Sequence, residues 1–523
     1  MNGTNNDSRG AIRLFSRDAG ADLNARFTVG WRAVAVLALG LGAAFLALAP
    51  DNAPRAQPLA GAAGPVAAPT VAQVQLRPDQ AATLERALAQ AETHGFEHNA
   101  FTPANLDSLL QSRDPGQRKQ GQTLLVEATL AYAKAVHSGR LAPGDFLHDW
   151  GLHPAAYDPT ADFLRAVSQD RLQPWLDSLS PPYTGYDSLK AGLVIYRGIA
   201  QRGGWPTLAA GPDLKQGMSD PRVAQLRERL AVEDSAVQAS SSPVFDAALA
   251  QAVVRAQKRY GLDPTGALDK STLAALNVPV SQRVAQIIAN MERWRWLPQQ
   301  LPSDRIQVNI AAAVLSVFHN DTPTLSMRVV TGKPGDETPM LSSVISTVVL
   351  NPPWNVPADI AQRELWPKER ANPGYFARNE FVVIRGPDGS TRLQQKAGDM
   401  SALGRVKFEF PNIYSVYLHD TPTHSTFSRY ARMVSHGCVR LEKPKALAEA
   451  LLANDPKWTA DTIAAAIDKG DTLRVRLTNQ VPVFIFYWTA FASPDGSMNF
   501  RSDPYSWDRL LLQRIGVLDA PKV

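Results

Sequence analysis

Apolar residues recur every three or four positions over much of the chain between residues 77 and 210. The stretches Thr123–Gly139 and Ser188–Gly203 show this spacing, and each ends at a glycine. Such a period is typical of helices that bury one face, and glycine commonly follows the last helical residue. We therefore predict a helical scaffold domain over residues 77–210.

A second and smaller helical unit follows at residues 211–280. Two amphipathic patterns and a short third one are joined there by the turn Gly261–Gly266. The helical period then continues over residues 281–303, which we expect to bridge to the next domain. Its Trp294 and Trp296 are expected to pack between domains and not to stack on a ligand.

Beyond Asp304 the apolar period changes from helical to alternating, which is typical of half-buried strands. Turn residues such as Asn320-Asp321 and Pro494-Asp495-Gly496 separate the alternating stretches. These predicted strands cover residues 305–318, 324–332, 342–350, 414–419, 472–477 and 482–491, and helical patterns cover residues 443–454 and 460–468. We predict a multidomain α+β protein whose helical units precede a mostly antiparallel β domain at residues 304–490, followed by a C-terminal segment at residues 491–523.

Residues 351–403 interrupt this β domain without a clean period. The insertion opens with the sequence NPPWNVPADIAQRELWPKE, in which Trp354 stands among prolines. A long connection inside a compact domain is more often functional than idle. We expect these residues to form a capping loop or subdomain over a site.

The N-terminal region has the pattern of a membrane anchor. Residues 1–28 are basic, and residues 33–49 form an apolar run without a charge. We predict a signal-anchor helix at residues 29–49, because a spanning helix needs roughly 20 apolar residues and a basic flank stays in the cytoplasm. The alternative is a signal peptide cleaved after Ala49. An Ala/Pro-rich linker at residues 50–76 would then space a periplasmic body from the inner membrane.

Bulk composition gives few further constraints on function. The chain has 523 residues, 45% of them hydrophobic and 20% charged, with a net charge of +5. This charge is mild for the length and does not indicate a nucleic-acid partner. The chain has a single cysteine, Cys438. In an exported protein, structural cysteines come in pairs, so a solitary one is reactive or pairs with another molecule.

Cys438 lies close to three of the nine histidines, His419, His424 and His436. A four-ligand zinc site is one interpretation, but the spacings are not those of common zinc motifs. The other is nucleophilic catalysis, in which an imidazole removes the thiol proton. Fifteen residues lie between His419 and Ser435, enough for a loop that returns the cysteine to the histidine. We favour catalysis without a metal or cofactor.

Either His419 or His436 could be the base. His436 stands two residues from Cys438, which in an extended segment is roughly 6.5 Å along one face, long for a hydrogen bond. His419 ends a predicted strand and can approach from another direction. Asp420 should point to the opposite face, so a backbone carbonyl is expected to orient the imidazole. Gly437 adds no side chain, so backbone N–H groups there could bind an oxyanion.

The order His419, fifteen residues, then Ser435-His436-Gly437-Cys438 resembles the signature of the YkuD-type L,D-transpeptidases, cysteine enzymes of peptidoglycan. The stretches RVVTGKPGDETPML, NPPWNVP and MERWRWLP are similar to the large membrane-anchored class with a helical scaffold and a capping loop. Small members have asparagine where this chain has Arg440, which leaves donor or acceptor details open. The unit at residues 211–280 resembles a peptidoglycan-binding-like module through Phe245, Asp246, Gln257, Gly261, Gly266, Thr272 and Leu273. A packing unit that binds no sugar is equally compatible with those residues.

The resemblance implies that Cys438 is the nucleophile and His419 the base, that the Gly437 and Cys438 N–H groups form the oxyanion site, and that Ser435 and His436 support the cysteine loop. It implies a 3→3 cross-link between tetrapeptide stems, with peptidoglycan stems and glycan as partners and carbapenem-type β-lactams as covalent inhibitors. Hydrolysis of the thioester, attachment of a lipoprotein or an inactive wall-binding scaffold are the alternatives.

Three more residues are candidates for binding the substrate. Arg440 could hold a stem-peptide carboxylate by two hydrogen bonds, or form an ion pair with Glu442 or another acid. Tyr417 could line the cleft or pack in the core. Trp354 could cover bound peptide or pack locally against the prolines.

Overall fold

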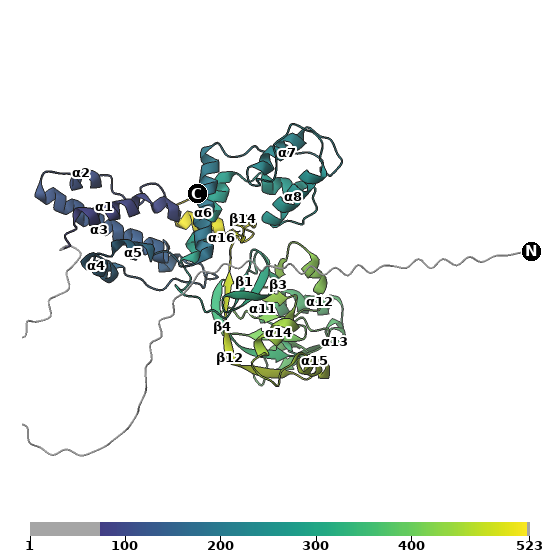
Figure 1. Cartoon of the computed structure of the whole chain (residues 1–523). Helices are drawn as coiled ribbons and strands as arrows, with labels where there is room; N and C mark the ends of the chain where they lie inside the picture. The colour runs from purple at the N-terminus through teal and green to yellow at the C-terminus, as the bar shows by residue number, and fades with distance from the viewer. Residues whose placement is uncertain (1–73, 520–523) are drawn as a thin grey trace, which may run out of the picture. The chain divides into compact units, whose positions relative to one another are not determined.

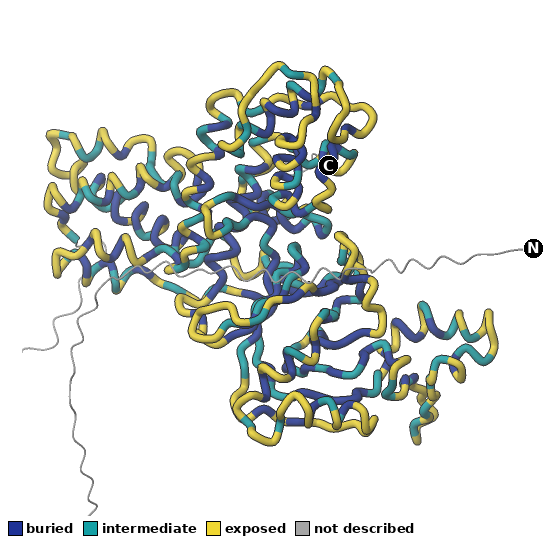
Figure 2. Tube along the Cα trace, turned by 45° about the vertical axis from the view of Figure 1, so that its right-hand side comes forward, coloured by how far each residue is buried: buried dark blue, intermediate teal, exposed yellow. Residues whose placement is uncertain are grey.

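The computed structural model describes residues 74–519 (Figure 1). The predicted basic segment, signal anchor and nearly all of the linker therefore lie outside the described residues. Within residues 74–519, no helix is both long and apolar enough to cross a bilayer. Buried residues follow the strands and the inner faces of the helices, whereas turns are exposed (Figure 2).

The N-terminal part of the described chain is helical, as predicted. Its elements are α1 (Pro78–Ala89), η2 (Ala91–His94), α2 (Leu106–Leu110), α3 (Pro115–Ser138), η3 (Pro143–Asp145), α4 (Thr160–Ser168), α5 (Leu172–Asp177) and α6 (Thr184–Gln201). Helix α3 starts where the Asp114 side chain accepts the N–H groups of Gly116 and Gln117 and ends at Gly139. Helices α1 to α5 enclose a hydrophobic core of their own, whereas α6 belongs to a larger core shared with the β domain.

The small helical unit contains α7 (Arg222–Ala231), α8 (Ala247–Arg259) and α9 (Lys270–Leu276). Gln257 of α8 is fully buried at its centre. Its amide donates to the side chains of Thr265 and Thr272 and to the carbonyl of Ala267, and it accepts the N–H of Gly266 at 2.9 Å. Several residues that carry the resemblance to a peptidoglycan-binding-like module thus stabilise the fold of the unit.

Helix α10 (Val280–Trp294) is the predicted bridge. Nearly all of its residues after Ala285 are buried, because it packs against α6 and the C-terminal segment. Trp294 stacks on Trp488 with ring centroids 4.4 Å apart, and Trp296 lies 5.6 Å from Trp150. Both tryptophans pack between parts of the chain, as predicted.

The β domain is built on a nine-stranded sheet in the order β10-β3-β11-β9-β8-β4-β12-β1-β2. Its strands are β1 (Arg305–Asn309), β2 (Val314–His319), β3 (Thr322–Gly332), β4 (Leu341–Leu350), β8 (Val406–Glu409), β9 (Leu418–His419), β10 (Met433–Ser435), β11 (Val439–Leu441) and β12 (Leu473–Phe486). An additional pairing between β2 and β3 closes the sheet on itself. Most pairings are antiparallel, as predicted, and the parallel ones are β1 with β12, β3 with β10 and β9 with β11. Helices α14 (Pro444–Leu452) and α15 (Ala460–Lys469) follow the cysteine.

Four strand predictions were wrong in detail. Residues 305–318 form the antiparallel pair β1 and β2, because Ala313 adopts a positive φ of 51° in a turn between them. Residues 472–477 and 482–491 belong largely to the single strand β12, whose register shifts between Arg476 and Val481. The predicted strand at residues 414–419 is reduced to β9, and Ser415 before it has a positive φ of 56°.

Residues 351–403 fold into a separate capping subdomain. It contains β5 (Trp354–Asn355), α11 (Ala358–Ile360), η4 (Ala361–Leu365), α12 (Trp366–Ala371), α13 (Tyr375–Arg378), β6 (Phe381–Arg385) and β7 (Thr391–Gln395). The three strands pair in the order β5-β7-β6 around a small core that includes Ile360, Leu365 and Leu393. The missing period in the sequence reflects the short elements of this subdomain.

The C-terminal segment forms β13 (Ala490–Ala492), β14 (Met498–Phe500) and α16 (Trp507–Arg514). Helix α16 packs on α10, and β13 contacts both α6 and α10. The segment thus joins the helical units to the β domain.

Candidate active site

A cavity of about 630 Å³ lies between strands β9, β10 and β11 and the capping subdomain. All seven side chains singled out from the sequence line it: Trp354, Tyr417, His419, Ser435, His436, Cys438 and Arg440. They come from segments up to 86 positions apart, the distance in sequence between Trp354 and Arg440. The fold therefore gathers the predicted site in one place.

The pairing of β9 with β11 aligns the central residues. His419 is the register partner of Arg440, and the N–H of Val439 donates to the Tyr417 carbonyl at 3.1 Å. Residues two apart on a strand share a face, and register partners do too. Cys438, Arg440, Tyr417 and His419 therefore project from one face into the cavity.

His419 is buried and neutral. Its Nδ1 lies 2.5 Å from the backbone carbonyl of Asp420, so Nδ1–H donates to that oxygen and Nε2 remains able to accept a proton. Burial, together with the positive charge of Arg440, lowers the pKa of His419 to about 3. The Asp420 carboxylate instead accepts the N–H groups of Arg405 and Thr421, at 2.8 and 2.7 Å. A backbone carbonyl orients the ring, as predicted.

Cys438 is a thiol at rest. Burial raises its pKa, although hydrogen bonding to Tyr417 and the charges of Lys407 and Arg440 oppose that effect. Its Sγ lies 3.9 Å from the carbonyl of Ser415. With the imidazole also uncharged, formation of the thiolate requires transfer of the thiol proton to a base during the reaction.

The turn from Ser435 to Cys438, called the catalytic turn below, is closed by Ser435. Its hydroxyl donates to the Cys438 carbonyl at 2.6 Å and accepts the Gly437 N–H at 3.3 Å. Gly437 has a φ of 105°, and an added Cβ would lie 3.2 Å from the Glu337 carbonyl. The positive φ favours glycine, and the Cβ contact would be tight.

The backbone donors of this turn differ from each other. The Gly437 N–H is engaged with Ser435, whereas within residues 74–519 the Cys438 N–H makes no hydrogen bond. Of these two N–H groups, that of Cys438 is therefore the one without a hydrogen-bond partner in the described residues. The role assigned to the Gly437 N–H stays a prediction.

The histidines near the cysteine are separated in space. His436 Nε2 lies 2.6 Å from the Glu364 carboxylate of the capping subdomain. His424 is exposed on a short helix, η5 (His424–Ser428). Within the described residues, no three His, Cys, Asp or Glu side chains are grouped so that they could hold a metal ion.

Arg440 is available to a ligand. The proposed pairing with Glu442 is wrong, because Glu442 accepts hydrogen bonds from both the main chain and the guanidinium of Arg328. Burial lowers the pKa of Arg440, and its Nε is buried without a hydrogen-bond partner among the described residues. Trp354 and Tyr417 both line the cavity, as the ligand-binding interpretation requires, and Tyr417 lies 5.5 Å from the His419 ring.

Two contributions to the cavity were missed in the sequence. Glu364 carried no recognisable pattern, and only its contact with His436 identifies it. Tyr414 lines the cavity, and its hydroxyl donates to the carbonyl of His148 in the helical region. Next to that contact, Gly151 and Asp149 pair with Met340 through two backbone hydrogen bonds of 2.8 Å. The helical region thus supports the cavity wall, which no local pattern could indicate.

Comparisons with known families agree with this organisation. Residues 303–476 match the L,D-transpeptidase catalytic domain, residues 75–193 match a family described as "Scaffold domain", and residues 219–276 match a "Putative peptidoglycan binding domain". A Haemophilus influenzae protein named "Putative L,D-transpeptidase" is 32% identical over 246 residues, which cover 44% of this chain and 49% of the relative. The chain thus spans about half the length of that curated relative.

Solved L,D-transpeptidases also match at low similarity. The enzyme from Stackebrandtia nassauensis is 14% identical, with 54% of this chain and 96% of that chain covered and a TM-score of 0.22. The enzyme from Xylanimonas cellulosilytica is also 14% identical, with 53% and 99% covered and a TM-score of 0.18.

Proposed function

We propose that the chain cross-links peptidoglycan stems by cysteine acyl transfer, since its residues match an L,D-transpeptidase catalytic domain, a scaffold domain and a peptidoglycan-binding domain. The observation that carries this proposal is the shared face of Cys438 and a neutral His419 in one cavity. A neutral imidazole whose Nδ1–H is engaged leaves Nε2 as the nitrogen that can accept a proton, which is the state that a general base needs.

In the first half-reaction, the Cys438 thiol proton passes to His419 Nε2 and Sγ bonds to the carbonyl carbon at the L-centre of the stem's diamino acid. The resulting oxyanion accepts the Cys438 N–H. The bond to the terminal D-alanine then breaks, and the imidazolium gives its proton to the departing amine. The products are a thioester and free D-alanine.

In the second half-reaction, the side-chain amine of another stem attacks the thioester carbonyl and gives a proton to His419. The carbon–sulfur bond breaks, and Sγ regains the proton. The product is a 3→3 cross-link, and no group other than the protein's own side chains and backbone is needed.

Arg440 supports a peptide substrate with a free carboxylate. Its side chain is partly buried, its Nε is fully buried without a partner in the described residues, and unpaired buried donors are costly. A carboxylate of the stem would satisfy it with charge-assisted hydrogen bonds. Trp354 and Tyr417 would bound the same peptide on the side of the capping subdomain and of β9.

A second cavity of about 480 Å³ favours transfer over hydrolysis. It shares residues Ser415–Tyr417 with the first cavity and is also lined by Lys407, Glu409 and Arg474. Lys407 and Arg474 each form an ion pair with Glu409. An acceptor that bears both an amine and a carboxylate could exchange contacts with this cluster, whereas water needs no such site. Hydrolysis of the thioester and attachment of a lipoprotein remain the competing outcomes.

We also propose that the enzyme acts in the periplasm while anchored to the inner membrane by residues 29–49. The apolar run with its basic flank supports this location. A cleaved signal peptide would instead leave a soluble periplasmic enzyme. In either case, the peptidoglycan-binding-like unit would bring the catalytic domain to glycan strands.

Incubation of the purified chain with disaccharide-tetrapeptide, followed by mass spectrometry, tests the function. Cross-linked dimer with release of D-alanine is expected. Tripeptide without dimer would replace transfer by hydrolysis, and unchanged substrate would refute both. Retained activity in Cys438→Ala would refute the mechanism.

A further inference from the structure

Thr338 lies beneath the catalytic turn and is completely buried. Its hydroxyl donates to the carbonyl of Gly437 at 2.7 Å and accepts the N–H of Gly332 at 2.8 Å. One hydroxyl group therefore joins the end of β3 to the residue that precedes the cysteine.

The bond from Thr338 controls more than the Gly437 carbonyl. A peptide group is planar and trans, so the Gly437 C=O and the Cys438 N–H belong to one rigid unit and point in opposite directions. A donor that fixes the carbonyl consequently fixes the direction of the Cys438 N–H, the free donor of the catalytic turn.

Tyr505 holds Thr338 from the other side. Its hydroxyl accepts the Thr338 N–H at 3.3 Å and donates to the Gly332 carbonyl at 2.5 Å. Burial raises the pKa of Tyr505 to about 12, so the phenol keeps its proton at neutral pH. The loop is tight as well, since a Cβ on Gly332 would lie 2.7 Å from the Thr338 nitrogen.

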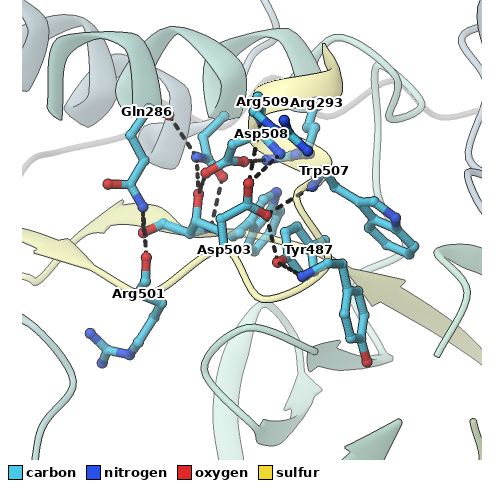
Figure 3. A network of polar contacts seen from close by, with 12 residues as sticks. Gln286, Arg293, Tyr487, Arg501, Asp503, Trp507, Asp508 and Arg509 are labelled. Carbon is cyan, nitrogen blue, oxygen red and sulfur yellow. Dashed lines mark hydrogen bonds and ion pairs between the residues drawn. The ribbon is translucent and has the colours of Figure 1, made fainter. Parts of the chain in front are cut away.

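The C-terminal segment in turn fixes Tyr505. The Tyr505 ring stacks on the Tyr487 ring, and the Tyr487 hydroxyl donates to the Asp503 carboxylate at 2.8 Å. Asp503 also accepts the N–H groups of Trp507 and Asp508 at the start of α16, and Asp508 pairs with Arg293 of α10 (Figure 3). The Tyr505 N–H also donates to the Tyr487 hydroxyl at 3.4 Å, so polar contacts run without a gap from the bridging helix to the catalytic turn.

We infer that Thr338 and Tyr505 are positioning residues that aim the Cys438 N–H at the oxyanion, so that the C-terminal segment is a working part of the catalytic centre. Tyr505 lies outside residues 303–476, which match the catalytic-domain family. The inference rests on the proposed role of Cys438 as nucleophile.

Two reactions of Cys438 distinguish the orientation of its N–H group from the reactivity of its thiol. Acylation by the carbapenem imipenem forms a tetrahedral oxyanion, whereas alkylation by iodoacetamide is a displacement that forms none. Loss of one oxyanion donor costs roughly 100- to 1,000-fold in rate, so a misaimed donor should cost about 10-fold or more. Rates of both reactions are measured by intact-protein mass spectrometry on the full chain.

Thr338→Val is expected to slow acylation by about 10-fold or more and to leave alkylation within about twofold. Thr338→Ser should restore acylation, because it keeps the hydroxyl. Thr129→Val, at a buried scaffold threonine whose hydroxyl bonds only its own helix, is the matched control and should change neither rate. If Thr338→Val does not fold, Tyr505→Phe should still slow acylation selectively, with Tyr196→Phe as its remote control.

Acylation of Thr338→Val and Tyr505→Phe at the wild-type rate would overturn the inference, as would an equal loss of acylation and alkylation. Wild-type protein that imipenem does not label on Cys438 would instead refute the proposed function, and the inference with it. Labelling of the wild-type protein by imipenem therefore distinguishes failure of the inference from failure of the proposed function.

Discussion

The imidazole of His436, two residues before the cysteine, lies 2.6 Å from the carboxylate of Glu364 in the capping subdomain. Arg363, which precedes Glu364 in the chain, lies 3.3 Å from the carboxylate of Asp336. The backbone carbonyls of Asp336 and Glu337 lie near Gly437. Two neighbouring residues of η4 therefore link the capping subdomain to His436 of the catalytic turn and to Asp336 near Gly437.

Glu364→Ala should loosen this contact and weaken substrate binding. The pair is about one-third exposed, so the loss should be about 1 kcal/mol, or roughly fivefold in KM. The value of kcat should change less, because neither Cys438 nor His419 is touched. Steady-state kinetics with tetrapeptide substrate measures both constants.

Glu380→Ala is the control for that variant. Glu380 is an exposed carboxylate of the same subdomain, and its side chain makes no hydrogen bond within residues 74–519. Its KM should match that of the wild type. An unchanged KM in Glu364→Ala would show that the contact does not hold the subdomain over substrate.

Substitution of the two reacting residues should separate nucleophile from base. Cys438→Ala should form no imipenem adduct at all. His419→Gln should still be labelled, but about 100- to 10,000-fold more slowly, which is the usual contribution of a general base. His436→Gln should lose far less. A larger loss in His436→Gln than in His419→Gln would reverse the assignment of the base.

The pH dependence of alkylation follows from the two shifted groups. Burial raises the pKa of Cys438 and lowers that of His419 to about 3, so both are neutral between about pH 5 and 8. The thiolate fraction then grows about tenfold for each pH unit below the thiol pKa. The iodoacetamide rate should rise steadily over this range. A plateau or step near pH 6 to 7 would indicate a preformed ion pair.

Arg440→Lys keeps the charge but removes the planar pair of donors. We expect a rise in KM of about tenfold for tetrapeptide, with little effect on alkylation of Cys438. Arg476→Lys, at an exposed position of β12, should leave KM unchanged. Equal KM values for the two variants would remove Arg440 from substrate recognition.

Gln257→Ala should destabilise the small helical unit by about 2 kcal/mol, because buried donors and acceptors lose their partner. Gln251→Ala, at an exposed position of the same helix, should cost nearly nothing. Hydrogen exchange over residues 219–276 measures the difference. Similar protection in both variants would contradict a structural role for Gln257.

Much of the architecture followed from period alone. The change from a helical to an alternating pattern at Asp304 marked the β domain, and the strands there are mostly antiparallel. The alternation of apolar residues could not show where one strand ends and the next begins. Residues 305–318 were therefore predicted as one strand, although the chain reverses at Ala313. An alanine with positive φ has no signal in the sequence, since the surrounding structure imposes it.

The sequence by itself determined the chemistry of the site: one thiol, histidines at suitable spacing and a glycine before the cysteine. These are local properties of residue type and order, and they decide which reactions are possible. Only the tertiary structure decided that His419 is buried on the face of Cys438 with a lowered pKa, that His436 contacts Glu364, and that Thr338 and Tyr505 support the catalytic turn. Desolvation and hydrogen bonding between distant residues depend on packing, and the order of residues along one segment does not contain that information.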